Sequence, residues 1–140
     1  DYGLLDPDTL EPRPSYWASL LWHRLMGTTV LDPKLPVEPN AYVYAQCLEH
    51  RQGGVTLLII NADRRHTVTL NLPTAATRYT LTARRLDTTQ VELNGHALRL
   101  ADDGTLPPLP GEPIGPGPAR FAPVSITFLS IAGAGNPDCR

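Results

Sequence analysis

The sequence predicts a mainly β protein, an antiparallel β-sandwich preceded by a single helix. Short apolar or alternating runs recur along residues 41–131, and polar, glycine or proline breaks separate them. Regular short strands with turn signals between them are typical of an antiparallel sandwich. With 140 residues, the chain is long enough for one domain that buries roughly two-thirds of its unfolded surface.

The first expected element is a helix of about three turns. Pro14 and Ser15 offer an N-terminal cap, and Gly27 stands where a C′ glycine ends a helix. Between them, apolar side chains recur at helical spacing, at Trp17, Leu20, Leu21 and Leu25. The aromatic pair Tyr16-Trp17 is interpreted as core packing rather than a platform for a sugar ring.

The strand-like runs follow this helix, at residues 41–48, 55–62, 66–72, 79–86 and 124–131. Residues 55–60 are almost entirely apolar, which predicts a central strand that is buried on both faces. Residues 107–118 contain six prolines and three glycines. Because proline cannot donate to a strand ladder, this segment is expected to be an extended surface loop.

A tight hairpin is predicted at Asn94-Gly95, since this dipeptide tolerates positive φ at both central positions of a type I′ turn. Asp102 and Asp103 precede Gly104. They are interpreted as a turn, because aspartate side chains bond to nearby backbone groups, although adjacent carboxylates superficially resemble a catalytic pair.

The two cysteines, Cys47 and Cys139, are far apart in the sequence, and neither has a second Cys or His at zinc spacing. A disulfide is therefore the preferred interpretation, and two unconnected thiols are the alternative. If the bond forms, it indicates an oxidising compartment.

Composition and motifs exclude several classes of function. A net charge of −2 argues against a nucleic-acid partner, and no apolar run approaches the roughly 18 residues of a membrane span. No phosphate-binding loop or Gly-x-Ser-x-Gly elbow occurs, and no cofactor is expected. Glu92 lies on the hairpin near His96 and is interpreted as a solvated cross-strand pair. The four histidines lack the spacing of a metal site, at His23, His50, His66 and His96.

Several of these stretches together resemble the C-terminal region of the heparanases and related β-glucuronidases of glycoside hydrolase family 79. They are the hairpin with its double-Asp turn and proline-rich exit, and residues 14–21, 26–31 and 55–61. The resemblance implies the last helix of a (β/α)8 barrel followed by an antiparallel sandwich. Residues 1–27 would then be the last strand-loop and helix of the barrel, and residues 28–140 the C-terminal sandwich domain.

The resemblance also implies a reaction whose catalytic groups lie elsewhere. Family members are retaining hydrolases that use an acid/base Glu and a nucleophile Glu about 5 Å apart on the barrel. The family's acid/base follows an Asn, and this sequence contains no Asn-Glu dipeptide. The chain is therefore expected to be a piece of a longer, secreted bacterial protein, inactive alone, whose upstream barrel carries both Glu residues. The implied substrate is a glucuronate-containing glycan of the heparan-sulfate type.

Three residues of this chain acquire roles from the resemblance. Tyr2 falls where a family tyrosine lies near the glucuronate carboxylate, to which a phenol donates a hydrogen bond, although Asp1 replaces the family Asn. Cys47 and Cys139 match the positions of a disulfide in vertebrate heparanases. An extracellular or periplasmic location would follow. The alternative function is a non-catalytic structural or glycan-binding sandwich, and glycan binding would require an exposed row of aromatic residues.

Overall fold

The computed structural model describes residues 3–36 and 38–140. Within them, one helix precedes ten strands. The elements are α1 (Pro14–Leu25), β1 (Met26–Leu31), β2 (Ala41–Leu48), β3 (Val55–Asn61), β4 (Val68–Leu72), β5 (Ala76–Thr82), β6 (Glu92–Leu93), β7 (His96–Ala97), β8 (Glu112–Ile114), β9 (Gly117–Phe121) and β10 (Ser125–Ile131).

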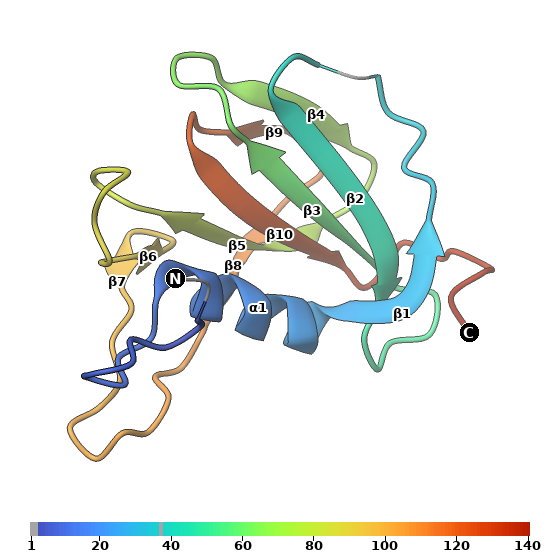
Figure 1. Cartoon of the computed structure of the whole chain (residues 1–140). Helices are drawn as coiled ribbons and strands as arrows, with labels where there is room; N and C mark the ends of the chain where they lie inside the picture. Colours follow the sequence, from blue (N-terminus) through green and yellow to red (C-terminus); the bar gives the residue numbers. More distant parts are fainter. Residues whose placement is uncertain (1–2, 37) are drawn as a thin grey trace.

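Two antiparallel sheets of very different size form the β structure. The large sheet has eight strands in the order β1-β2-β3-β10-β5-β6-β7, and β8 also pairs with β5. The small sheet contains β4 and β9 alone. Helix α1 crosses one face of the large sheet, and the small sheet lies on the other side (Figure 1). The mainly β, antiparallel architecture that the sequence predicts is confirmed, and the sandwich is strongly unequal.

The core between α1 and the large sheet explains why apolar residues recur at helical spacing in α1. Trp17 and Leu21 are 2% and 1% exposed and belong to one buried cluster with Leu58 of β3 and Phe128 of β10. The ring of Tyr16 meets Trp17 edge to face, with centroids 5.4 Å apart. This aromatic pair is core packing, as the sequence predicts.

The second core lies between the two sheets. Ile59 and Leu129 of the large sheet are fully buried there, with Val68 and Phe121 of the small sheet. Strand β3 therefore sends alternate side chains into both cores, and it pairs with β2 on one side and β10 on the other. The predicted central position of this apolar strand is confirmed.

The Asn94-Gly95 hairpin is also confirmed, because φ is 48° at Asn94 and 82° at Gly95. The Asn94 side chain has a second role that the sequence does not reveal. Its Oδ1 accepts a hydrogen bond from the Thr80 backbone N–H at 2.9 Å, and its Nδ2 donates to the Arg78 carbonyl at 3.0 Å. The hairpin is thereby fastened to β5.

The expected role of Gly27 is wrong. The helix ends at Leu25 and the backbone is already extended at Met26, so Gly27 lies inside β1 rather than at C′. A Cβ atom at Gly27 would be 2.7 Å from the carbonyl oxygen of Cys47. Glycine is therefore required here for close approach between β1 and β2. At the other end of the helix, Arg13 is the N-cap and its side chain makes no capping hydrogen bond, so the expected cap at Pro14-Ser15 is also displaced.

The loop expected at residues 107–118 is only partly correct. It contains β8, which pairs with β5 alone, and the first part of β9, which pairs with β4 alone. Proline is compatible with these positions because each strand needs partners on one side only. No strand is predicted at β1, although residues 26–31 carry part of the resemblance. The start of β5 is predicted three residues too late, at Tyr79 instead of Ala76.

Candidate functional site

The N-terminal loop, residues 3–13, leads directly into α1 and follows Tyr2, which itself lies outside the described residues. Backbone hydrogen bonds close the loop: Asp6 N–H donates to the Glu11 carbonyl and Arg13 N–H to the Leu4 carbonyl, both at 2.9 Å. A β-bridge joins Leu5 and Pro12. The position after Tyr2 is thus held by a closed loop anchored on a buried helix.

Asp6 organises the tip of this loop. Its Oδ1 accepts hydrogen bonds from the backbone N–H groups of Thr9 and Asp8, both at 3.0 Å. These bonds lower the pKa of Asp6 below its usual value, and the charge of Arg13, 3.6 Å away, lowers it further. The carboxylate is therefore ionised, and it is bound by groups of its own loop.

The 98–106 loop, which follows the hairpin, is built by a second aspartate. Asp103 Oδ1 accepts hydrogen bonds from the Thr105 N–H at 3.0 Å and the Thr105 hydroxyl at 2.7 Å. Both bonds lower the pKa of Asp103, the hydroxyl bond having the larger effect. Gly104 takes a φ of 80° and donates to the Ala101 carbonyl. Asp102-Asp103 is therefore a turn, in agreement with the sequence.

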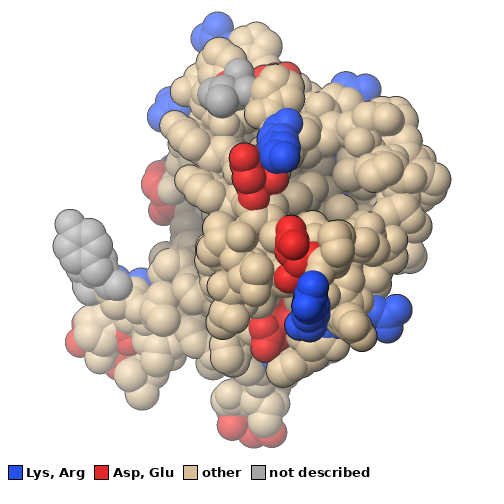
Figure 2. Space-filling model, turned by 90° about the vertical axis from the view of Figure 1, so that its right-hand side faces the viewer, with Lys and Arg blue, Asp and Glu red and all other residues tan. Residues whose placement is uncertain are grey.

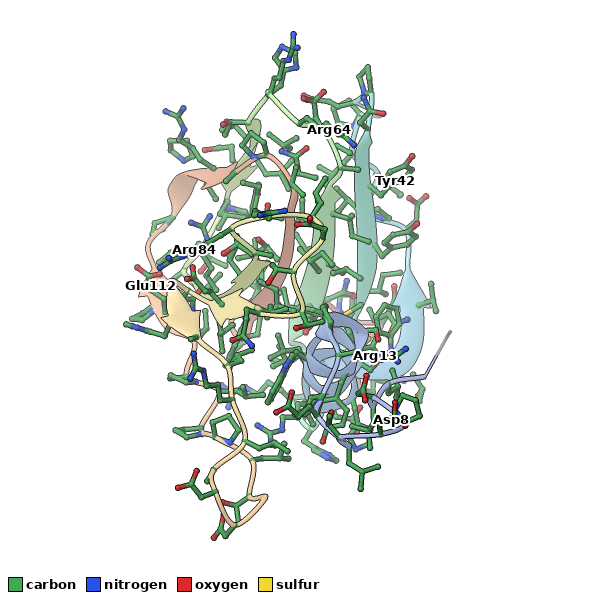
Figure 3. All side chains as sticks on the ribbon, turned by 60° about the vertical axis from the view of Figure 1, so that its left-hand side comes forward. Asp8, Arg13, Tyr42, Arg64, Arg84 and Glu112 are labelled. Atoms are coloured by element: carbon green, nitrogen blue, oxygen red, sulfur yellow. A yellow bond between two sulfur atoms is a disulfide. The ribbon has the colours of Figure 1, made fainter. Side chains whose placement is uncertain are left out.

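A hollow of about 710 Å³ separates these two loops at the beginning of α1. Trp17 contributes to its wall, and charged side chains border it from both loops, Asp6, Glu11 and Arg13 on one side and Arg99 and Asp102 on the other. In Figure 3, Asp8 and Arg13 mark this end of the molecule beside α1, and Arg64 lies at the opposite end.

Four of the described carboxylates do not have the properties of a glycosidase acid. Four aspartates have lowered pKa values: in Asp63 the main cause is the hydrogen bonds from the Arg65 and His66 N–H groups, and in Asp87 it is the bond from Arg85. A general acid at neutral pH requires a raised pKa. Glu92 does not pair with His96 as expected, because its Oε1 lies 3.5 Å from Nε of Arg84.

Cys47 and Cys139 form a disulfide with an S–S distance of 2.08 Å and a Cα–Cα distance of 5.3 Å. Two backbone hydrogen bonds hold the same region: Gly53 N–H donates to the Cys139 carbonyl, and Asn136 N–H donates to the Gly53 carbonyl. The C-terminal residues are thus attached both to β2 and to the turn between β2 and β3.

Other site types have no support in the described residues. Across residues 3–36 and 38–140, no three His, Cys, Asp or Glu side chains gather where they could bind a metal ion. No helix in the same ranges has the length and apolarity needed to cross a membrane. On the face shown in Figure 2, basic side chains lie among acidic ones and do not form a continuous stripe.

Comparison with known proteins places this chain beside a group of glycosidases. No family model matches it. It is 36% identical to baicalin-β-D-glucuronidase of Scutellaria baicalensis over 95% of this chain and 27% of that protein. It is 34% identical to heparanase of Gallus gallus over 95% of this chain and 28% of that protein. It is 30% identical to inactive heparanase-2 of Homo sapiens over 99% of this chain and 28% of that protein.

The chain therefore spans little more than a quarter of the length of these relatives. The role of Tyr2 stays a prediction, and the predicted pairing of the cysteines is present in the structure. The sequence does not single out Arg13 and Arg99, which border the hollow. No local signal marks these arginines, because only the folded chain brings the two loops to one hollow.

Proposed function

The chain is a heparanase-like sequence, homologous to heparanases and to a plant β-glucuronidase, and from this premise we propose that it is the C-terminal portion of a retaining glycoside hydrolase of family 79. In this proposal, residues 1–27 complete a (β/α)8 barrel and residues 28–140 form the adjoining sandwich domain. The enzyme cleaves glucuronosyl bonds in glycans of the heparan-sulfate type. The observation that supports this most strongly is 36% identity to baicalin-β-D-glucuronidase over 95% of the chain.

The two catalytic Glu residues belong to the barrel outside this sequence. The carboxylates described above support this division, because several of them are ionised and engaged in turns. This segment alone is accordingly inactive. It completes the barrel with α1 and supplies the N-terminal loop, which as the last βα loop lies at the carboxyl-terminal face, where barrel active sites are found.

The proposed location is extracellular or periplasmic. The Cys47–Cys139 disulfide supports it, since such bonds form and persist in oxidising compartments.

The direct test of the function compares the whole protein with the isolated 140 residues on an aryl β-D-glucuronide. We expect turnover by the whole protein and none by the isolated chain. The control substrate is the aryl β-D-glucoside, which differs from the glucuronide in lacking the carboxylate. Hydrolysis by the pure isolated chain would refute the assignment of both catalytic groups to the barrel, and an inactive whole protein would refute the enzymatic proposal.

The proposed substrate contact of this chain is Tyr2, whose hydroxyl donates to the glucuronate carboxylate. Tyr2→Phe in the whole protein removes a hydrogen bond to a charged group, worth about 1.5 to 3 kcal/mol. We expect kcat/KM on the glucuronide to fall by roughly tenfold to a hundredfold. The glucoside offers the phenol no anion and is expected to lose little. Equal losses on both substrates would mean that Tyr2 has a structural role instead.

The second candidate function is that of a non-catalytic structural or glycan-binding protein related to the heparanases. It is favoured by the 30% identity to inactive heparanase-2 over 99% of this chain. Glycan binding by the sandwich is a version of this candidate, because Tyr42 and Tyr44 are 52% and 49% exposed on one side of β2. The glucuronide assay decides between the candidates, since only the first predicts turnover.

A further inference from the structure

We infer that the 98–106 loop of the sandwich forms part of an outer glycan subsite, in which Arg99 binds an anionic group of a polymeric substrate. This inference rests on the proposed function. The inference adds a substrate contact from the sandwich domain to that function, at some distance from the bond that is cleaved.

The position of the hollow indicates which face of the barrel the 98–106 loop borders. If α1 is the last barrel helix, the N-terminal loop is a βα loop and lies at the catalytic face of the barrel. The hollow is bordered by this loop and by the 98–106 loop together. Both segments extend past the same end of α1 (Figure 1). If so, the 98–106 loop borders the catalytic face as well.

Arg99 lies at the start of the 98–106 loop and borders the hollow. The residue is exposed and follows Leu98, which is buried and donates a backbone hydrogen bond to the Val91 carbonyl at 2.9 Å. The backbone that carries Arg99 is thus well anchored. Arg84 and Arg85 contact carboxylates of Glu92 and Asp87, but no ion pair involves Arg99 among residues 3–36 and 38–140. Its guanidinium is available to bind a carboxylate or sulfate through paired N–H donors.

Carboxylates also border the same hollow. Asp6 is engaged by the N–H groups of Thr9 and Asp8 and by Arg13. Glu11 and Asp102 remain, and carboxylates of this kind accept hydrogen bonds from sugar hydroxyls. Thr89 and Gln90 add further polar groups to the wall. The lining therefore suits a hydroxyl-rich chain, and Arg99 is the group that distinguishes an acidic chain from a neutral one.

The test uses the whole protein and two polymers, heparan sulfate and the unsulfated glucuronate–N-acetylglucosamine polymer, beside the aryl β-D-glucuronide. Arg99→Gln is expected to lower kcat/KM on the polymers by roughly two- to fivefold, the range of an exposed ion pair. The loss should diminish at high salt, because exposed charges are screened. The aryl glucuronide is too short to reach Arg99 and should be unaffected.

Two variants control for charge and for general effects. Arg99→Lys keeps the charge and is expected to retain most of the polymer activity. Arg64→Gln removes an exposed arginine at the opposite end of the molecule and should match the wild type on all substrates.

The outcomes separate the inference from the proposed function. A loss on both polymers identifies the carboxylate as the partner of Arg99, and a loss on heparan sulfate alone identifies sulfate. A wild-type enzyme that is active on the polymers and unchanged by Arg99→Gln overturns the inference, as does an equal loss on polymer and aryl glucuronide. A whole protein inactive on the aryl glucuronide overturns the proposed function, and the subsite with it.

Discussion

The two ends of the large sheet are held by different kinds of interaction. At the tail end, which comprises residues 49–54 and 132–140, a disulfide attaches the C-terminus to β2, and backbone hydrogen bonds attach it to the turn between β2 and β3. At the loop end, which comprises residues 3–13 and 98–106, aspartate side chains and short backbone bonds hold polar loops around a hollow. Neither loop has a covalent cross-link.

This difference separates stability from recognition. The tail end lies beside a buried cluster of Cys47, Cys139 and Val55, so its contacts stabilise the fold. The loop end exposes charged side chains that are not part of either buried core. Loops positioned by a rigid scaffold are where binding groups are usually found, which agrees with the role proposed for Arg99.

The strongest disruption of the tail end should come from Cys139→Ser. The disulfide spans a sequence separation of 92 residues, and in the chain-entropy model its loss costs about 4 to 5 kcal/mol. We expect denaturant unfolding at a lower midpoint, with faster hydrogen exchange in residues 132–140 than in β3. Cys47→Ser should give the same shift, and an unchanged midpoint in either variant would contradict this account.

A smaller effect at the same end is expected from Gly27→Ala. The new Cβ would meet the Cys47 carbonyl oxygen at 2.7 Å, so backbone must move, at a cost of about 1 to 3 kcal/mol. Gly133→Ala is the matched control, since a Cβ there meets nothing within 4 Å. Thermal unfolding of both variants tests whether glycine is required at position 27. Equal melting temperatures of the two variants would contradict this requirement.

On the side of the loop end, Asn94→Gly tests how the hairpin is attached. Glycine keeps the positive φ but removes the hydrogen bonds to Thr80 and Arg78, which should cost about 1 to 2 kcal/mol. Asn94→Ala should cost more, because alanine also disfavours the turn. Equal stability of wild type and Asn94→Gly, measured by denaturant unfolding, would show that the side-chain bonds contribute nothing.

The smallest effect expected is a response of the loop end to acid. The pKa values of Asp6 and Asp103 are lowered in the folded chain, so their contribution is fully present above the usual value of 3.8 and is lost as pH falls through the lower, folded values. The Thr9 and Thr105 amide signals should shift in NMR spectra over that range. The disulfide does not titrate there, so Cys139 should not respond. In Asp6→Asn, a Thr9 signal that still titrates as in the wild type would contradict the assignment.

Local chemistry in the sequence determined several elements by itself. The Asn94-Gly95 pair specifies a turn through the φ angles it tolerates. Asp103 specifies another because its side chain accepts hydrogen bonds from the Thr105 N–H and hydroxyl, and the apolar run of β3 specifies burial on two faces. Each of these depends on residues that are close in sequence. They could be predicted for that reason.

Only the tertiary structure decided which distant segments meet. From the sequence, Gly27 is predicted to end the helix, but its role in the structure is to allow the close approach of β2. The proline-rich residues are predicted to form a loop, but β4 and β5 provide strand partners for them on one side. Arg99 has no distinguishing neighbour in sequence, and the hollow exists because the N-terminal loop and the 98–106 loop pass the same end of α1. Close approach between segments depends on how sheets and helix pack, and local patterns do not encode it.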